Sequence, residues 1–439
     1  MNRPQRVFSS PRRSHVLLAL VLLLVGSGCS STYVRERSAP PLQTTPEQVV
    51  YLVGDFGAES DVFHDVVDAI ATELYEDEHR RGSGDSPFLL STGDNLYPTG
   101  LPPHATAETP ETVELARLVE AWNRCVYSGR PVPFVLIPGN HDHDNDALRT
   151  TRETGEIAGW FELPRLVDAP HWVPVPGSIP DDVADVPSHI REARRDPAEF
   201  ARLFAPERIP FAGRAVGIVA IDSQLLIDLY RRGHDEAAAE YLTALRRELR
   251  SIHGDAWRGV VAHHPIATYG KHRPAYGARW LFGPGWPQFP ETGHRFTGFP
   301  PVGTLITFAW WVRHHPQNFH SGPYTRYAEA LTELLEQEGV SVFLAGHDHS
   351  LQLIDLGRIH PMERPSIPNI GVAPHSPRPL VVVSGAGTWV DPVSRGRGTL
   401  AHHTGGGFVR LAFHRRHLEI ELIDRHGERV YRHRLGREQ

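Results

Sequence analysis

Short hydrophobic runs recur along the chain, and each ends in a turn that carries glycine or histidine. Their apolarity is continuous rather than alternating, which is typical of strands buried on both faces. Residues 239–252 and 326–338 lie between such runs and carry apolar residues at helical spacing. The alternation of strand and helix predicts a layered α/β domain. The predicted strands are Val49–Val53, Phe88–Leu90, Phe134–Ile137, Val216–Ile221, Gly259–Ala262, Val340–Ala345 and Leu380–Val383.

The pattern changes in the last sixty residues, which predict consecutive strands joined by tight turns. These strands are Phe408–His414, Leu418–Ile423 and Arg429–Leu435. Earlier in the chain, Glu111–Ser128 is amphipathic, and we interpret its Cys125 as a small core residue. The spacing also predicts a helix over Ser188–Phe204.

The composition sets limits on the class of protein. Of the 439 residues, 40% are hydrophobic and 22% are charged, which is enough for a large core and excludes disorder as the main state. The formal net charge is −7, and this disfavours a surface for nucleic acid. The 27 histidines indicate metal chemistry, but so many histidines also guarantee that several have no such role.

The N-terminus predicts an export signal over residues 1–28. Four arginines precede the apolar run Val16–Val25, which is too short to span a bilayer, and small residues then lead to Cys29. Cys29 stands where bacterial lipoproteins carry the acylated cysteine of their lipobox, although Gly26 replaces the usual leucine. We therefore expect a lipidated Cys29 followed by a tether to residue 47, with simple secretion as the alternative.

Five polar motifs follow predicted strands. In an open α/β sheet, ligands collect at the carboxyl ends of the strands, so turns at these positions can converge on one site. Each motif alone is a weak signal, because a Gly-Asp pair after a strand is usually only a turn. The motifs are Gly54-Asp55-Phe56-Gly57, Gly93-Asp94-Asn95-Leu96-Tyr97, Gly139-Asn140-His141-Asp142, His263-His264-Pro265 and Gly346-His347-Asp348-His349.

The residue types in these motifs fit a centre with two metal ions. Aspartate, asparagine, histidine and tyrosine offer mixed oxygen and nitrogen ligands, which suit iron, zinc or manganese. Two cations about 3.5–4 Å apart can activate a water and hold a phosphoryl group.

The order of the five motifs resembles that of the metallophosphoesterases, and specifically of the small, tartrate-resistant purple acid phosphatases. Further matching segments are Ser384-Gly385-Ala386-Gly387 and Gly406-Gly407-Phe408. The resemblance implies a four-layer α/β/β/α sandwich over residues 48–437, with insertions at about 144–213 and 275–325. It also implies Fe(III) plus a divalent metal (Fe, Zn or Mn), with Tyr97 as the ligand that separates this family from most metallophosphoesterases.

The resemblance assigns roles to particular residues. Asp55, Tyr97 and His349 would hold the first metal, Asn140, His263 and His347 the second, and Asp94 would bridge the two. His141 and His272 would contact the substrate and act as catalytic residues, as general acid catalysis requires. Lys271 stands where mammalian members have an acid, and a cation there would favour a phosphate dianion.

Other histidines remain unassigned. His143 and His264 adjoin expected ligands and could orient them, and Asp142 could do the same. We interpret the pairs His314-His315 and His402-His403 as solvated.

The sequence therefore predicts an acid phosphatase that cleaves phosphate monoesters of small molecules or phosphoproteins. We place it in the bacterial cell envelope, anchored to a lipid bilayer through Cys29. A manganese or zinc phosphodiesterase or nucleotidase on the same fold is one alternative. A surface lipoprotein that uses the iron site for redox chemistry or binding is another. The aromatic segment 275–325 is open to three interpretations: a lid over the site, a patch for lipid, or a helix on the core.

Overall fold

The computed structural model describes the chain from residue 32 to residue 437, with gaps. The described residues are 32–40, 44–81, 86–101, 106, 108–148, 169–177, 186–210, 214–272, 321–359, 379–393, 395–396 and 398–437. The expected signal segment, Cys29, His314-His315 and most of the aromatic segment lie outside these residues. In the described part, no helix is both long and apolar enough to cross a bilayer.

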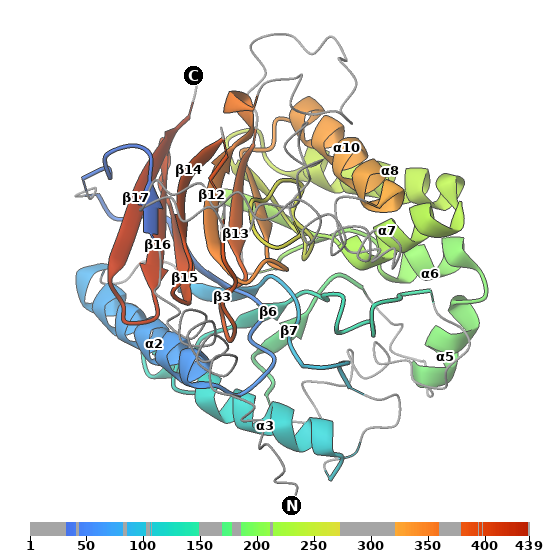
Figure 1. The fold of residues 1–439 in the computed structure, drawn as a ribbon, viewed down its shortest axis with the longest axis horizontal. Helices are drawn as coiled ribbons and strands as arrows, with labels where there is room; N and C mark the ends of the chain where they lie inside the picture. Colours follow the sequence, from blue (N-terminus) through green and yellow to red (C-terminus); the bar gives the residue numbers. More distant parts are fainter. Residues whose placement is uncertain are drawn as a thin grey trace, which may run out of the picture. The chain divides into compact units, whose positions relative to one another are not determined.

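Two large sheets form the centre of the domain (Figure 1). The seven-stranded sheet has the order β17 (Arg429–Gly436), β16 (His417–Asp424), β15 (Gly407–Phe413), β2 (Gln48–Val53), β3 (Phe88–Ser91), β6 (Phe134–Leu136) and β7 (Trp172–Pro174). The eight-stranded sheet has the order β1 (Thr32–Val34), β14 (Thr399–His403), β12 (Leu351–Asp355), β13 (Leu380–Ser384), β11 (Val342–Ala345), β10 (Trp257–Val261), β9 (Val216–Ala220) and β8 (Glu207–Arg208). A small hairpin joins β4 (Val126–Tyr127) to β5 (Arg130–Pro131).

Helices cover the outer face of each sheet. In Figure 1, α2 and α3 lie beside the seven-stranded sheet, and α7, α8 and α10 lie beside the eight-stranded sheet. The helices are α2 (Asp61–Arg81), α3 (Pro110–Trp122), α5 (Val186–Ala193), α6 (Pro197–Leu203), α7 (Ser223–Arg232), α8 (Asp235–Ser251) and α10 (Gly322–Gln337), with a 3₁₀ turn, η3, at Leu356–Arg358. The predicted four-layer α/β/β/α sandwich is confirmed.

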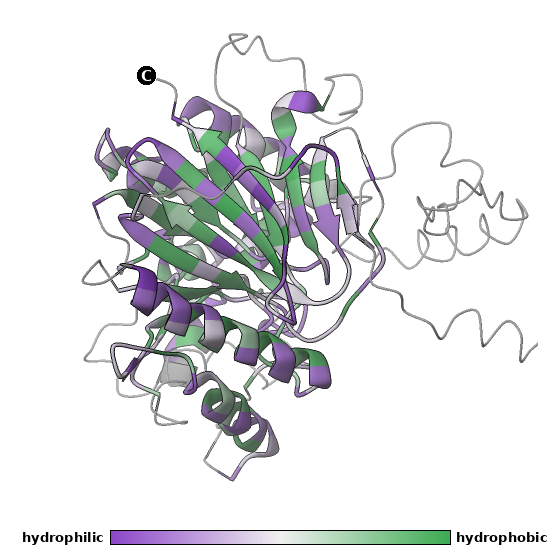
Figure 2. Cartoon of the chain, turned by 90° about the vertical axis from the view of Figure 1, so that its left-hand side faces the viewer, coloured by the Kyte–Doolittle hydropathy of each residue, from purple (hydrophilic) through white to green (hydrophobic). Residues whose placement is uncertain are grey.

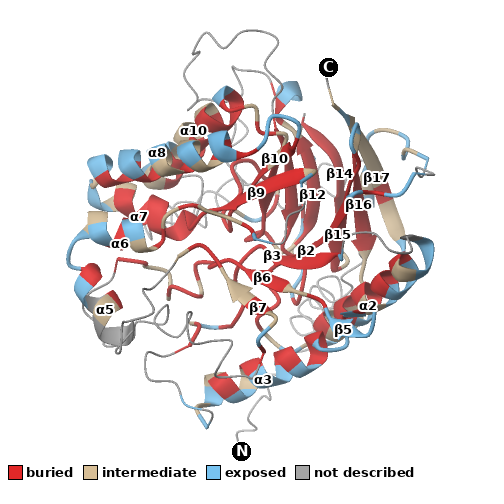
Figure 3. Cartoon of the chain, turned by 180° about the vertical axis from the view of Figure 1, so that it is seen from behind, coloured by how far each residue is buried: buried red, intermediate tan, exposed pale blue. Residues whose placement is uncertain are grey.

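The alternation of side chains along each buried strand explains the layers. In β2, Val49 and Tyr51 pack in the large cluster that the helices share, whereas Val50 and Leu52 pack in a second cluster between the sheets. Successive side chains of a strand point to opposite faces, so a strand buried on both sides must be apolar throughout. Figure 3 shows these central strands buried along their length and the helices exposed along their outer faces. Figure 2 shows the hydrophobic residues concentrated in the strands.

Part of the expected tether is a strand. Thr32–Val34 forms β1, which pairs antiparallel with β14 at the edge of the eight-stranded sheet. The backbone N–H of Ala39 donates to the carbonyl of Arg432, so the contact continues beyond the strand. The expected tether therefore contains a short strand, because an unpaired sheet edge offers backbone groups to any nearby segment.

Two further local predictions need correction. The single helix expected over Ser188–Phe204 is two helices, because Asp196 accepts from the backbone of Ala198 and caps a new helix that starts at Pro197. The pair His402-His403 is buried in β14 rather than solvated, and His402 stacks on Tyr33 of β1 with ring centroids 5.5 Å apart. Cys125 is buried, as predicted.

Candidate metal centre and active site

The expected ligands meet where strands from both sheets end. Asp55 follows β2 and Asp94 follows β3 in the seven-stranded sheet, and Asn140 follows β6. His263 follows β10 and His347 follows β11 in the eight-stranded sheet. Within each sheet these strands are parallel neighbours, so their carboxyl ends lie on one side. The structure thus brings together residues that are up to 292 positions apart in the chain.

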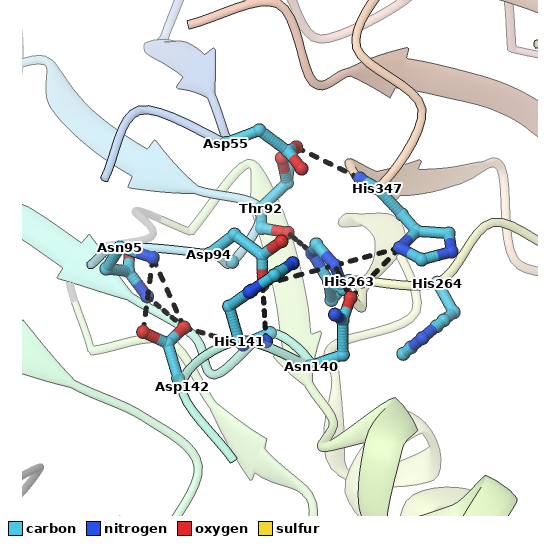
Figure 4. Close-up of polar contacts among 12 residues, drawn as sticks. Asp55, Thr92, Asp94, Asn95, Asn140, His141, Asp142, His263, His264 and His347 are labelled. Atoms are coloured by element: carbon cyan, nitrogen blue, oxygen red, sulfur yellow. Dashed lines mark hydrogen bonds and ion pairs between the residues drawn. The ribbon is translucent and has the colours of Figure 1, made fainter. Parts of the chain in front are cut away.

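One group of ligand atoms is formed by Asn140, His263 and His347. Oδ1 of Asn140 lies 2.8 Å from Nε2 of His263 and 3.0 Å from Nδ1 of His347. The two imidazole nitrogens are 3.2 Å apart. Nδ1 of His263 lies 2.8 Å from the carbonyl of Thr92, to which it donates, so Nε2 presents its lone pair to the group. Figure 4 shows these side chains converging between the strand ends.

A second group is formed by Asp55, Tyr97 and His349. The Tyr97 hydroxyl donates to Oδ1 of Asp55 over 3.3 Å, and Nε2 of His349 lies 3.6 Å from the same oxygen. Nδ1 of His349 lies 3.0 Å from Oδ2 of Asp391, which directs Nε2 toward Asp55.

Asp94 lies between the two groups and uses one carboxylate oxygen for each. Oδ1 is 3.4 Å from Nε2 of His263, and Oδ2 accepts from the Tyr97 hydroxyl over 3.1 Å. Two ligand atoms that lie about 2.0–2.2 Å from one cation are themselves about 3–3.5 Å apart. The separations in the two groups run from 2.8 to 3.6 Å and are close to this spacing, so the geometry fits two cations that share Asp94.

The burial of these side chains also favours a bound cation. Asp55, Asp94, Asn140, His263 and His347 are all buried, and no lysine or arginine in the described part of the chain pairs with either aspartate. Burial and the nearby charge of Asp94 raise the pKa of Asp55 well above its usual value. Burial opposes the charge on Asp94 too, but His263 and His141 outweigh it and lower the pKa of that carboxyl. Two adjacent buried carboxylates surrounded by histidines form a donor set suited to divalent metals.

The backbone is strained at the same residues. Asp55, Asp94 and His347 have φ values of 54°, 55° and 68°, in the left-handed region that disfavours residues with a Cβ. The strain turns each ligand sharply out of its strand. The flanking glycines allow close approach: a Cβ on Gly139 would collide with the carboxylate of Asp94, and one on Gly93 would lie 2.6 Å from Nδ1 of His263.

Comparison with known proteins identifies the family to which this fold belongs. A family model for calcineurin-like phosphoesterases matches residues 49–288, more than half of the chain. This chain is a calcineurin-like phosphoesterase. A search of curated proteins finds no match to it.

Several solved structures are similar to this phosphoesterase, among them one from yellow lupin and one from Plasmodium. The purple acid phosphatase PPD1 of yellow lupin seeds aligns with a TM-score of 0.50 and 15% identity, over 91% of this chain and 55% of the lupin chain. GAP50, the anchor in the inner membrane complex of Plasmodium, aligns with a TM-score of 0.46 and 12% identity over 89% of each chain. At this level of identity the lupin structure supports the fold alone.

The two expected catalytic histidines of the phosphoesterase flank the ligand groups. The ring of His141 lies 4.6 Å from that of Tyr97, and the ring of His272 lies 4.1 Å from that of His347. Both side chains are partly exposed, whereas Asp94 and His347 are buried. The backbone N–H of His141 donates to Oδ1 of Asp94 over 3.0 Å, which fixes the histidine beside the expected bridging ligand. Lys271 is exposed, with Nζ 3.9 Å from Oδ2 of Asp391.

Asp391 is a residue that the sequence analysis missed. Its side chain contacts His349, and its backbone N–H donates to the His349 carbonyl over 2.8 Å. Burial disfavours its charge, but His349 outweighs burial and lowers the pKa of Asp391. No signal in the sequence marks an aspartate 42 positions beyond its partner, apart from its place after the Ser384-Gly385-Ala386-Gly387 segment.

Asp142, His143 and His264 stand beside expected ligands in the chain and differ in what they contact. Asp142 accepts hydrogen bonds from the backbone N–H of Gly139 over 2.8 Å and from Asn95, so it fixes the loop that carries Asn140. Burial and, after it, the charge of Asp94 raise the pKa of Asp142 to about 6. Nε2 of His143 lies 2.6 Å from Asp222, away from the ligand groups.

His264 lies next to the ligand groups. It lies within metal-ligand reach of His263 and His347, and its Nδ1 is 2.9 Å from the Ser223 hydroxyl. Burial and the neighbouring His263 lower the pKa of His264 well below its usual value, so the ring is neutral. It packs against His263 and His347 of the first group, with ring centroids 5.0 Å and 4.4 Å away.

Proposed function

We propose that this chain is a phosphatase that hydrolyses phosphate monoesters, with Fe(III) and a divalent ion (Fe, Zn or Mn) at the site. The observation that carries this proposal is the position of the Tyr97 hydroxyl, 3.3 Å from Asp55 and 3.1 Å from Asp94. A phenolate in that position is a strong donor to Fe(III), and such a tyrosine is the feature that the resemblance to purple acid phosphatases implies.

The assignment of ligands follows the two groups. Asp55, Tyr97 and His349 would hold one metal, Asn140, His263 and His347 the other, and Asp94 both. When bound, the two cations supply the Lewis acidity that activates a water and neutralises charge on the phosphoryl group.

His141 is suited to handle the proton of the leaving group. Its Nδ1 lies 2.6 Å from the carbonyl of Pro98, and a carbonyl can only accept, so Nδ1 carries a hydrogen. The remaining nitrogen, Nε2, is then the atom that can hold a proton for the leaving oxygen. His272, on the other side of the ligand groups, can share this task.

Lys271 would favour a substrate with a dianionic phosphate. Its ammonium is exposed next to the partly exposed His272, so it adds positive charge beside the site without entering the ligand groups. This fits a monoester, whose phosphate carries up to two negative charges, better than a diester, which carries one. The substrate would be a phosphorylated small molecule or a phosphoprotein.

The visible spectrum and metal content of the purified protein test the proposal. We would record them beside Tyr97→Phe, with a chromogenic phosphate monoester and a matched diester as substrates. Tyr431→Phe is the matched control, because Tyr431 is also buried but lies on β17, outside the site. We expect iron at about one per chain or more, a purple band that only Tyr97→Phe abolishes, and hydrolysis of the monoester.

Other results would assign a different function. A colourless protein that contains zinc or manganese and prefers the diester, with activity unchanged in Tyr97→Phe, would be a phosphodiesterase or nucleotidase. A purple protein that cleaves neither ester would instead use its iron for redox chemistry or binding.

We also propose that the protein is exported and anchored to a bilayer by acylation of Cys29. The supporting features are the basic and apolar segment before Cys29 and the lipobox-like position of that residue. β1 begins three residues later and pairs with β14, so an anchor at Cys29 would hold the domain close to the lipid. Detergent-phase partitioning of the full chain and of Cys29→Ala tests this; partitioning of both into the aqueous phase would indicate a secreted protein.

A further inference from the structure

Trp389 is exposed beside the metal ligands, unlike the other tryptophans in the described part of the chain. Its side chain is 43% exposed, whereas Trp122, Trp172 and Trp257 are buried. The neighbouring Val390 is 44% exposed. An indole ring is among the most hydrophobic side chains, so exposing it next to a reactive site forgoes stabilisation that burial would supply.

The Trp389 ring borders one of the two ligand groups. Its centroid lies 4.4 Å from that of Tyr97 and 5.7 Å from that of His349, at interplanar angles of 51° and 49°. Both neighbours belong to the group that contains Asp55. A ligand seated at the metals therefore has the indole as an immediate apolar neighbour.

The backbone around Trp389 is held in place on both sides. Before it, the N–H of Gly387 donates to the carbonyl of Gly54 over 3.1 Å, and the hydroxyl of Ser60 donates to the carbonyl of Thr388 over 3.1 Å. After it, the N–H of Asp391 donates to the carbonyl of His349 over 2.8 Å. These bonds tie the segment to the loops that carry Asp55 and His349, so the exposed ring is fixed in advance of binding.

We propose that Trp389 forms a subsite for a flat aromatic ring in the alcohol part of the substrate. The inference rests on the proposed monoesterase activity and narrows its substrate class to small phosphate monoesters that carry an aromatic ring. The phosphate would sit at the metals with Lys271 and His272 nearby, and the ring would stack on the indole. Aromatic rings prefer offset or edge-to-face contact at centroid distances of about 4.5–7 Å, and the fixed indole can offer such a contact at no cost in backbone ordering.

Two esters with the same leaving atom test this subsite. 2-Phenylethyl phosphate and 2-cyclohexylethyl phosphate both release a primary alkoxide, so they differ in the flatness of the ring and not in intrinsic reactivity. We expect the wild-type protein to favour the phenyl ester by about 3- to 10-fold in kcat/KM, the range that one aromatic contact supplies. Trp389→Leu should reduce this ratio to about one, while Trp389→Phe should retain part of it.

A binding measurement separates recognition from turnover. Calorimetric titration of the metal-loaded protein with the corresponding phosphonates, which are not hydrolysed, should show the same preference in Kd and the same loss in Trp389→Leu. Tyr75→Ala is the control, because Tyr75 is an exposed aromatic residue on α2, outside the site, and both ratios should be unchanged.

The results distinguish this inference from the proposed function. If the wild-type protein cleaves neither ester, the proposed monoesterase activity is wrong. If it cleaves both and Trp389→Leu leaves the phenyl-to-cyclohexyl ratio unchanged, the subsite is wrong although the activity stands. An equal loss for both esters would also overturn the subsite, because it would assign Trp389 a general structural role.

Discussion

Two regions of this protein bury several charged side chains, and they compensate those charges in different ways. At the carboxyl ends of the strands, Asp55 and Asp94 are buried among histidines. On the outer side of the seven-stranded sheet, Asp77 and Glu421 are buried beside Arg410, in a cluster that we call the arginine network. Arg410 bonds to both acids, with Nη2 2.9 Å from Asp77 and Nη1 2.9 Å from Glu421.

The strand register builds the arginine network. Arg410 of β15 stands opposite Glu421 of β16, which stands opposite Arg432 of β17, so charges of alternating sign lie on three adjacent strands. Asp77 completes the network from α2, where it also accepts from the Tyr51 hydroxyl over 2.6 Å.

Asp55 and Glu421, one acid from each region, have opposite pKa shifts for this reason. Burial opposes the charge on Glu421, but arginines, Arg410 foremost, outweigh it and lower its pKa. Burial and Asp94 raise the pKa of Asp55, and no lysine or arginine in the described residues pairs with that carboxylate. A buried charged cluster that neutralises itself fits a structural role, whereas buried carboxylates without a lysine or arginine partner fit a ligand site.

The largest expected effect is from Asp94→Asn, which removes the carboxylate that both ligand groups share. We expect kcat/KM for a phosphate monoester to fall on the order of 1,000-fold or more and the metal content to drop. The metal-free variant should remain folded, because the change removes a buried charge next to Asp55. Elemental analysis, kinetics and thermal unfolding check this, and a variant that keeps both metals and full activity would contradict the bridging role.

Arg410→Met should have the opposite profile. It leaves Asp77 and Glu421 buried without their cation, and we expect a loss of about 3–5 kcal/mol in the free energy of unfolding. Metal content per folded chain should be unchanged. Urea unfolding with elemental analysis measures both quantities, and loss of metal without loss of stability would break the distinction between the two regions.

The pH dependence of the Arg410→Met effect sharpens this prediction. The folded-state pKa of Glu421 is lowered, so the network stabilises the fold above the ordinary carboxyl pKa and loses that contribution as pH falls through the folded value. The difference in unfolding free energy between wild type and Arg410→Met should therefore be largest near pH 7 and shrink below about pH 4. A difference that is constant from pH 7 to pH 3 would mean that the arginine acts through packing alone.

The smallest expected effect is from Asp391→Ala, which leaves the ligands in place but removes the partner of His349. Without the carboxylate, the ring loses the contact that points Nε2 toward Asp55. We expect metal affinity to fall about 10- to 100-fold, with a smaller loss in Asp391→Asn, whose amide oxygen can still accept. Competition with a chelator measures the affinity, and Asp255→Ala, an exposed aspartate before β10, is the control.

Much of this architecture was predictable from the sequence, because the signals are local. Continuous apolarity from Val49 to Val53 predicts a strand buried on both faces, and a glycine next to Asp55 predicts the turn that follows it. The five motifs predicted which residues would share one site, and the structure brings residues from all five together. They meet because the carboxyl ends of parallel strands lie at one edge of a sheet. By contrast, β1 forms because β14 has a free edge, and the residues Thr32–Val34 alone do not predict that such an edge lies nearby.

The sequence by itself determined the central strands of both sheets, the layered α/β class and the kinds of ligand, since these depend on periodicity and on residue type. Only the tertiary structure decided that one oxygen of Asp94 meets His263 and the other Tyr97, that Asp391 orients His349, and that Trp389 stands exposed beside them. These relations join residues from separate loops, and their distances follow from how the two sheets pack. Packing is a property of the whole chain, and no local pattern encodes it.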